Sequence, residues 1–190
     1  MDALPLVISS GWAAGVNAYA TVLLLGVFGR LGLGDVPDGL ENPGVIAAAA
    51  VLYAVEFVTD KVPYVDNLWD TVHTAIRPTI AAALGVLLAG DATGLEDALA
   101  AVGSGGTALA SHAVKAGLRA AVNLSPDPVT TATASLTEDF CVGVVVVLIV
   151  THPWAALTLA AILLVIGLLA LRMLWRAIRA RSSPAARQSS

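Results

Sequence analysis

Charged side chains are scarce in this sequence, because only 13% of the 190 residues are charged whereas 57% are hydrophobic. A soluble domain of this length needs a larger polar surface, so the composition indicates a membrane protein. The mean hydropathy of +0.83 agrees. The single cysteine, Cys141, excludes an intramolecular disulfide and is expected to be a buried thiol. The first residues lack the basic stretch of a cleaved signal, so we expect a retained first span.

Motifs of common catalytic and cofactor sites are also missing. The sequence contains no metal-ligand spacing typical of zinc, no glycine-rich phosphate loop and no nucleophile-elbow or metalloprotease signature. We therefore predict no catalytic residues and no cofactor, and nothing indicates a nucleic-acid partner. The expected surroundings are the lipid bilayer of the inner (plasma) membrane.

Long apolar segments are what the sequence has in abundance. A spanning helix needs roughly 20 mostly apolar residues. Six segments fit or nearly fit, namely Leu4–Phe28, Pro43–Lys61, Pro78–Gly90 with an extension over 71–77, Leu95–Val122, Val129–Val150 and Trp154–Trp175. The sequence therefore predicts an all-α, polytopic membrane helical bundle of about six spans. The transmembrane domain would cover residues 1–180, followed by a disordered cytoplasmic tail over 181–190.

An amphipathic segment lies between the second and third predicted spans, near residues 64–76. Its apolar side chains fall on one helical face, and Asp66, Asp70 and His73 fall on the other. We expect an interfacial helix that lies at the cytoplasmic surface or dips into the bundle. Together with Asp60, these three residues are candidate metal ligands in an acidic vestibule, since oxygen-rich clusters suit hard cations.

The basic residues predict the orientation, because Lys and Arg favour cytoplasmic loops. In a six-span arrangement one side carries Lys61, Arg77, Lys115, Arg119 and the C-terminal arginines 172, 176, 179, 181 and 187. The opposite side carries mostly acids, with Arg30 as the exception. Both termini are therefore predicted to be cytoplasmic.

Weak internal similarity suggests two repeats, residues 1–90 and 95–179. Ser9-Ser10-Gly11 followed by Asn17 matches Ser104-Gly105-Gly106 followed by His112; Asn42-Pro43 leading to Glu56 matches Ser125-Pro126 leading to Asp139; Arg77-Pro78 matches His152-Pro153. Three spans per half would give an inverted repeat, as in many transporters. The Ser/Gly stretches in the first and fourth spans permit either close helix packing or broken helices.

Ionisable residues inside the predicted spans are the candidates for function, because such residues normally face a cavity or a partner. The candidate ion-pathway residues are Asn17, Glu56, Asp60, His112, Lys115, Arg119, Asn123, Glu138 and Asp139. We predict that Glu138 or Asp139 lies within hydrogen-bond reach of Lys115, Arg119 or His112, and that Glu56 faces the same interior. Such a cluster is either a structural ion-pair network or a site for a cation or proton.

Several of these residues belong to a recognisable pattern. The runs Gly15-Val16-Asn17-Ala18-Tyr19, Glu56 to Asp66, Trp69 to His73, Arg119 to Asn123 and Glu138-Asp139 resemble the bacterial membrane family known as domain of unknown function 4126. The resemblance covers nearly the whole chain and implies an integral membrane protein without a known activity. Glu56 to Lys61 is also similar to the Glu-x-Gly-Asp-Lys/Arg motif of small two-repeat cation/proton exchangers, although the glycine is missing here.

Taken with this resemblance, the residues favour a small membrane transporter or channel for a cation, proton-coupled through His112 and working as a homodimer. Three alternatives stay open. The basic stripe on the fourth span could receive an anionic solute or lipid headgroup, the protein could be a structural or accessory membrane protein, or the acidic residues could serve a metal-dependent membrane enzyme acting on lipid phosphate.

Overall fold

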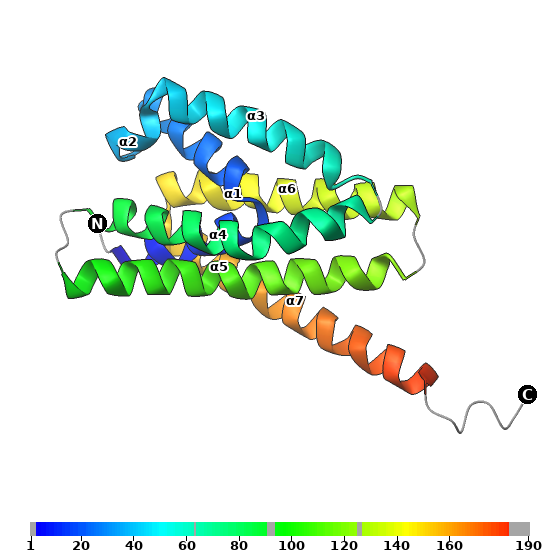
Figure 1. Cartoon of the computed structure of the whole chain (residues 1–190). Coiled ribbons are helices and arrows are strands. Elements are labelled where there is room, and N and C mark those ends of the chain that lie inside the picture. The colour runs from blue at the N-terminus through cyan, green and yellow to red at the C-terminus, as the bar shows by residue number, and fades with distance from the viewer. Residues whose placement is uncertain (1–2, 63, 91–93, 125–126, 183–190) are drawn as a thin grey trace, which may run out of the picture.

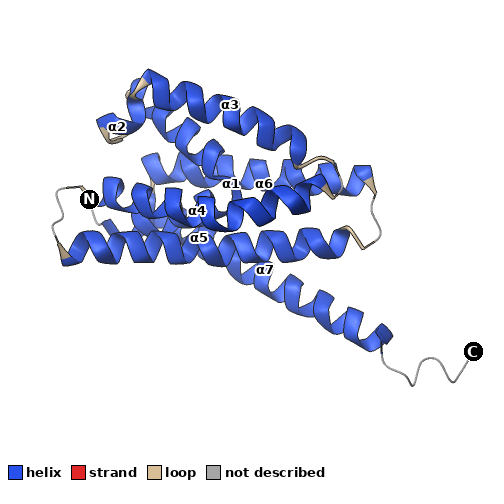
Figure 2. Cartoon of the chain, viewed as in Figure 1, coloured by secondary structure: helices blue, strands red, loops and turns tan. Residues whose placement is uncertain are grey.

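The chain is entirely helical over the residues that the computed structural model describes, which are 3–62, 64–90, 94–124 and 127–182 (Figure 2). The helices are α1 (Ala3–Arg30), α2 (Asp38–Glu41), α3 (Pro43–Thr59), α4 (Val65–Ala89), α5 (Leu95–Val122), α6 (Pro128–Thr151) and α7 (Pro153–Ser182). In this part of the chain, α1, α4, α6 and α7 are long and apolar enough to cross a membrane. The expected membrane helical bundle is thereby confirmed.

Proline and capping residues fix where the helices begin. Asn42 caps α3 by accepting a hydrogen bond from the Gly44 amide, and Pro43 opens the helix. Asp127 caps α6 in the same way, with Pro128 in the first turn, where a missing N–H costs nothing. Hydrogen bonds that Thr130 donates from its hydroxyl and its amide hold the pKa of Asp127 below its usual range.

The bundle has two ends. One, the Ala89 end, holds the end of α4 and the start of α5, and the other, the Asn123 end, holds the end of α5 and the start of α6. Figure 1 shows α4 and α5 side by side and antiparallel, with α3 sloping across the top and α7 leaving the bundle toward the C-terminus. Both α3 and α5 run toward the Asn123 end, and α4 and α6 run back.

Helix α1 does not cross the bundle but turns back at Asn17, whose φ and ψ of −150° and 99° are not helical. Its first residues lie at the Ala89 end, where Ala3 and Leu4 share a pocket with Ala89 and Glu96. Its last residues return to the same end, since Val27 and Arg30 share a pocket with Pro43, the first residue of α3. Helix α1 is therefore a re-entrant pair of half-helices (Figure 1).

This reversal corrects the single crossing that was expected of the first span. A helical segment of 28 mostly apolar residues suits a span by length and composition. The chain nevertheless reverses in the middle, so Ala3 lies at the Ala89 end whereas α7 ends beyond the Asn123 end (Figure 1). Non-helical backbone at membrane depth is tolerated where protein surrounds it. That condition is met here, because 72% of the apolar window of α1 is buried, against 11% for α7.

The amphipathic segment near 64–76 is not a separate interfacial helix. It forms the first half of α4, which continues through Pro78 to Ala89. Its polar residues Asp66, Asp70 and His73 are buried, whereas Leu68 and Val72 are exposed. The polar face therefore points into the bundle and the apolar face outward, which is the arrangement expected in lipid.

Small residues bring the first half of α1 against α5. A Cβ on Gly11 would collide with the backbone of Ser104, and one on Gly15 would collide with Ser111 and Ala108. The stretch Ser9-Ser10-Gly11 is helical, and α5 is unbroken at Ser104-Gly105-Gly106, so both serve close packing. The broken helix expected among the first and fourth spans is α1, and its break lies at Asn17.

The proposed repeat gains no support from these contacts. Gly11 lies by Ser104 and Gly15 by Ala108 and Ser111, so the two matched segments run parallel. An inverted repeat requires them to be antiparallel. Pro78 lies inside α4 whereas Pro153 opens α7, and the matched Ser125-Pro126 lies outside the described residues. The predicted tail is also shortened, because α7 continues to Ser182 and residues 183–190 lie outside the described part.

Replacing Gly15 by alanine tests the close contact between α1 and α5. We expect Gly15→Ala to lower the free energy of unfolding by about 1–3 kcal/mol, because overpacking forces the backbone apart. The matched control is Gly106→Ala, since a Cβ at Gly106 meets nothing within 4 Å. Denaturant titration in detergent measures the free energy of unfolding of both purified variants. A Gly15→Ala protein with the wild-type free energy of unfolding would contradict the close packing of α1 against α5.

Candidate ion-binding site

A cluster of buried charged and polar side chains occupies the Asn123 half of the bundle. We call it the charge cluster; it consists of Asn17, Glu56, Asp60, Lys61, Asp66, Asp70, Arg77, His112, Lys115, Arg119, Asn123, Glu138 and Asp139. Five helices contribute, and the cluster follows α5 from Asn123 to His112, a distance of roughly 16 Å at 1.5 Å per residue. The length of the cluster is therefore about half the thickness of a hydrocarbon core of roughly 30 Å.

Arg77 of α4 is the innermost cation and is fully buried. Its guanidinium donates to Glu56 at 2.8 Å and lies 3.2 Å from a carboxylate oxygen of Asp70. The same group donates to the Gly15 carbonyl of α1 at 3.4 Å and to His112 at 2.7 Å. Arg77 thus joins α1, α3, α4 and α5 through the several donors of its planar guanidinium.

Lys115 and Arg119, one turn apart on α5, bind the carboxylates of α3 and α6. Lys115 donates to Asp60 at 2.7 Å and lies 3.6 Å from Glu138. Arg119 holds Glu138 through two hydrogen bonds of 2.6 and 3.1 Å. The prediction that Glu138 would reach Lys115 or Arg119 is confirmed, and Glu56 faces the same interior, 3.7 Å from Lys115.

The outer members of the charge cluster are held by amides. Asn123 donates to both carboxylate oxygens of Asp66, at 2.8 and 3.0 Å. Asn17 donates to Asp139 at 3.1 Å, and Lys61 approaches Asp139 to 4.0 Å. All nine residues predicted to line an ion pathway therefore belong to the charge cluster, in which Asp139 contacts both Asn17 and Lys61.

The break in α1 supplies backbone groups to the charge cluster. Asn17 acts as the N-cap of the second half-helix, because its side-chain oxygen accepts a hydrogen bond from the Ala20 amide. The carbonyls that end the first half-helix are free for other donors. Lys115 donates to the Val16 carbonyl at 3.1 Å, and Arg77 donates to Gly15. A helix C-terminus carries partial negative charge, so these two cations are well placed there.

Both buried histidines are neutral in this arrangement. His112 accepts from Arg77 at Nδ1, since arginine can only donate, and its Nε2–H donates to the Asp70 carbonyl at 3.1 Å. His73 donates from Nδ1 to the Trp69 carbonyl, and in the neutral ring Nε2 is then the acceptor that lies 3.0 Å from the Tyr19 hydroxyl. Protonation of His112 would place a proton where Arg77 now donates, which couples the two groups.

Acceptors outnumber donors in the charge cluster. Six carboxylates face four cations, so two acids remain unneutralised while both histidines are neutral. Several buried oxygens accept no hydrogen bond, namely Oε2 of Glu56, Oδ1 of Asp60, both carboxylate oxygens of Asp70 and Oδ2 of Asp139. A buried carboxylate without a donor is costly, so these atoms favour a proton or a cation.

The four candidate metal ligands are not brought together. Asp60 pairs with Lys115, Asp66 with Asn123, Asp70 with Arg77, and His73 with Tyr19. Within the described residues, no group of three or more His, Cys, Asp or Glu side chains is placed to hold a metal ion. The expected metal site in an acidic vestibule is replaced by ion pairs and hydrogen bonds, because the polar face of α4 points into the bundle.

Three cations of the charge cluster are buried more deeply than their sequence positions indicated. Arg77 was assigned to a cytoplasmic connection, but it lies inside α4 and is fully buried. Its spacing could have shown this, because residues 66, 70, 73 and 77 fall on one helical face. Lys115 and Arg119 are likewise buried, so these three cations do not report which loops are cytoplasmic.

The comparison with curated proteins gave no match, and neither did the comparison with solved structures. Residues 4–173, which include every helix that contributes to the charge cluster, match the family described as domain of unknown function DUF4126. The chain therefore belongs to the DUF4126 family.

Proposed function

We propose that the protein is a small membrane transporter or channel for a cation, with transport coupled to protons. The observation that carries the proposal is the excess of buried acceptors. The charge cluster holds two more carboxylates than cations, so the acids share their partners, and both oxygens of Asp70 accept no hydrogen bond at 2% exposure although Arg77 lies 3.2 Å away. A purely structural network gains nothing from such groups, because each unpaired acid costs stability.

The re-entrant half-helices support the same proposal. In many transporters, discontinuous helices present free backbone groups to a site near the middle of the membrane. Here the break at Asn17 places the carbonyls of Gly15 and Val16 beside Arg77 and Lys115. A cation that displaced either side chain would find these carbonyls and the acids already in position.

The alternatives have less support. An anion site requires a cation that is free to bind, whereas Lys115 and Arg119 each lie within 4.0 Å of three carboxylates. An enzyme that uses a metal on lipid phosphate would need the Asp60, Asp66 and Asp70 ligands that are paired elsewhere.

Flux into liposomes tests the proposal directly. The purified full-length protein is reconstituted, and uptake of sodium, potassium and protons is recorded with imposed pH gradients of both signs. We expect cation flux whose rate changes with pH and which empty liposomes lack. Impermeability to every cation in the panel, together with uptake of an anion such as phosphate, would overturn the proposal.

We also propose that the Asn123 end faces the cytoplasm. The acids Asp35, Asp38 and Glu41 lie in or beside α2, and Glu96 and Asp97 open α5, all at the Ala89 end. The arginines of the α7 C-terminus lie at the other end, which agrees with the preference of basic residues for the cytoplasm.

Cysteine labelling in intact cells checks this orientation and the reversal of α1 together. In a Cys141→Ala background, Asp38→Cys and Leu4→Cys are expected to react with an impermeant thiol reagent, and Arg176→Cys is not. Leu4 is 58% exposed at the Ala89 end, so it should share the compartment of Asp38. Labelling of Leu4→Cys only after the cells are opened would indicate instead that α1 crosses the membrane.

A further inference from the structure

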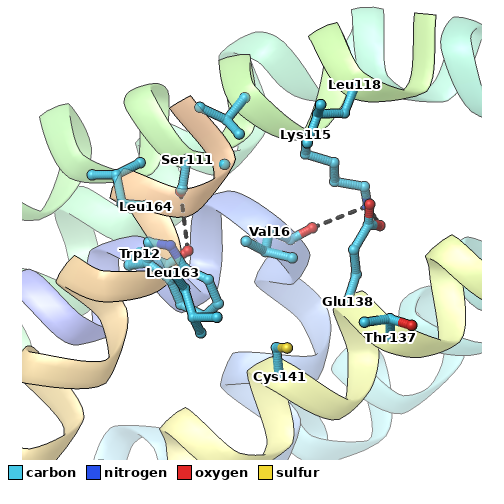
Figure 3. Close-up of a pocket in the computed structure, with 12 residues that line it drawn as sticks. Trp12, Val16, Ser111, Lys115, Leu118, Thr137, Glu138, Cys141, Leu163 and Leu164 are labelled. Carbon is cyan, nitrogen blue, oxygen red and sulfur yellow. Dashed lines mark hydrogen bonds and ion pairs between the residues drawn. The ribbon is translucent and has the colours of Figure 1, made fainter. Parts of the chain in front are cut away.

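A small pocket lies beside the break in α1, between α1, α5, α6 and α7 (Figure 3). Its volume is about 140 Å³, close to that of an engineered apolar cavity of about 150 Å³ that holds benzene. Apolar side chains form most of the wall, namely Trp12, Val16, Val114, Leu118, Leu163 and Leu164. The pocket therefore suits the compact apolar body of a small organic molecule better than a hydrated inorganic ion.

One side of this pocket is formed by the charge cluster. Figure 3 shows Lys115 and Glu138 reaching toward each other from α5 and α6 at its edge. Of the two, the acid is the accessible one, because 22% of the Glu138 side chain is exposed against 3% for Lys115. A ligand that enters the pocket therefore meets a carboxylate before it meets a cation.

Glu138 can leave Lys115 and Arg119 without depriving either cation of a carboxylate partner. Lys115 is closer to Asp60, at 2.7 Å, than to Glu138, at 3.6 Å. Arg119 also donates to the Asp60 carbonyl at 2.7 Å and lies 3.4 Å from Asp66. Because acids are in excess in the charge cluster, a new cation at Glu138 would leave Lys115 and Arg119 with carboxylates of their own.

A groove between α5 and α6 leads to the same carboxylate from the outer surface. It is lined by Leu118, Arg119, Val122, Val129, Thr130, Thr133, Ala134, Thr137 and Glu138, and its volume is about 580 Å³. Leu118, Thr137 and Glu138 line both the groove and the pocket. An apolar molecule in the membrane could therefore approach Glu138 sideways, between two helices.

From these observations we infer the class of substrate: a small organic ammonium ion with an apolar body, whose charged nitrogen pairs with Glu138 and whose body fills the pocket beside Trp12. This inference rests on the proposed cation transport and deepens it. The indole of Trp12 is the only aromatic ring among the residues that line the pocket, and it adds a large apolar surface against which the body of the molecule can pack.

Calorimetric titration of the full-length protein in detergent tests the inference with cyclohexylammonium, whose ring has nearly the size of benzene. Cyclohexanol and cyclohexanecarboxylate serve as the neutral and anionic counterparts. We expect cyclohexylammonium to bind about tenfold or more tightly than either counterpart. Glu138→Gln should remove that preference, whereas the matched change Glu41→Gln, outside the charge cluster and the pocket, should leave it unchanged.

Leu164→Phe provides a second variant that keeps every charge and fills the pocket. It should weaken cyclohexylammonium binding about tenfold or more while the thermal unfolding temperature stays near that of the wild type. Equal binding of all three compounds, or unchanged binding by Leu164→Phe, would overturn the inference. Proton or alkali-ion flux without cyclohexylammonium binding would refute the substrate class and leave cation transport standing. Binding of cyclohexylammonium without flux of any cation would refute cation transport and leave the class of ligand standing.

Discussion

Replacing Arg77 by methionine is expected to lower the free energy of unfolding by about 3–5 kcal/mol, because one partner of a buried ion pair is removed and the other stays behind. Arg77 is fully buried, and it contacts Glu56, Asp70, His112 and the Gly15 carbonyl. All four groups would lose a donor in a place that water does not reach. Denaturant titration in detergent measures the change.

Two further variants decide whether charge is the cause. Arg176→Met changes an exposed arginine of α7 in the same way and should alter the free energy by no more than about 0.5 kcal/mol. Adding Glu56→Gln and Asp70→Asn to Arg77→Met should recover a large part of the loss, because neutral amides no longer require the cation. If Arg77→Met were as stable as Arg176→Met, Arg77 could not be the centre of the cluster.

The sequence predicted the composition of the charge cluster better than the path of the chain. Glu56, His112, Lys115 and Glu138 could be assigned to one interior because ionisable groups in an apolar segment have few other places to go. That argument needs only the position of each residue within its segment. It holds even though α1 turns back at Asn17 instead of continuing across the bundle.

The reversal of α1 could not be read from composition, because it depends on the backbone angles of one residue. The segment Ala3–Arg30 has the length and apolarity of a span. Asn17 is a strong N-cap residue in its middle, and Gly11 and Gly15 allow the first half to lie against α5. Each signal is common inside ordinary spans, so the tertiary contacts with α4, α5 and α6 decide the outcome.

The first half of α4 was misplaced for a related reason. An amphipathic helix in water buries its apolar face, so Val65, Leu68 and Val72 suggested a helix lying on the membrane surface. In a bundle surrounded by lipid, the same pattern turns its polar face inward. The choice depends on whether partners such as Arg119 and Asn123 are available inside, and only the fold shows that they contact Asp66.

Asp70→Asn should separate a transport site from a structural network. The side chains have nearly the same shape, and neither carboxylate oxygen of Asp70 accepts a hydrogen bond in the structure. Arg77 keeps its hydrogen bond to Glu56 in this variant. We therefore expect the thermal unfolding temperature to change little, whereas cation flux into liposomes should fall by about tenfold or more, which corresponds to a rise of about 1.4 kcal/mol in the barrier to transport.

The pH dependence and a matched control complete this experiment. A carboxylate that binds either a proton or the transported ion makes flux depend on pH, so the Asp70→Asn protein should show a flatter pH profile than the wild type. Asp38→Asn changes an exposed aspartate near the Ala89 end and should preserve both the rate and the profile. If Asp70→Asn transported at the wild-type rate with an unchanged profile, Asp70 would be a structural partner of Arg77 alone. The excess acids would then have to act through Glu56 or Asp139, whose remaining oxygens also lack donors.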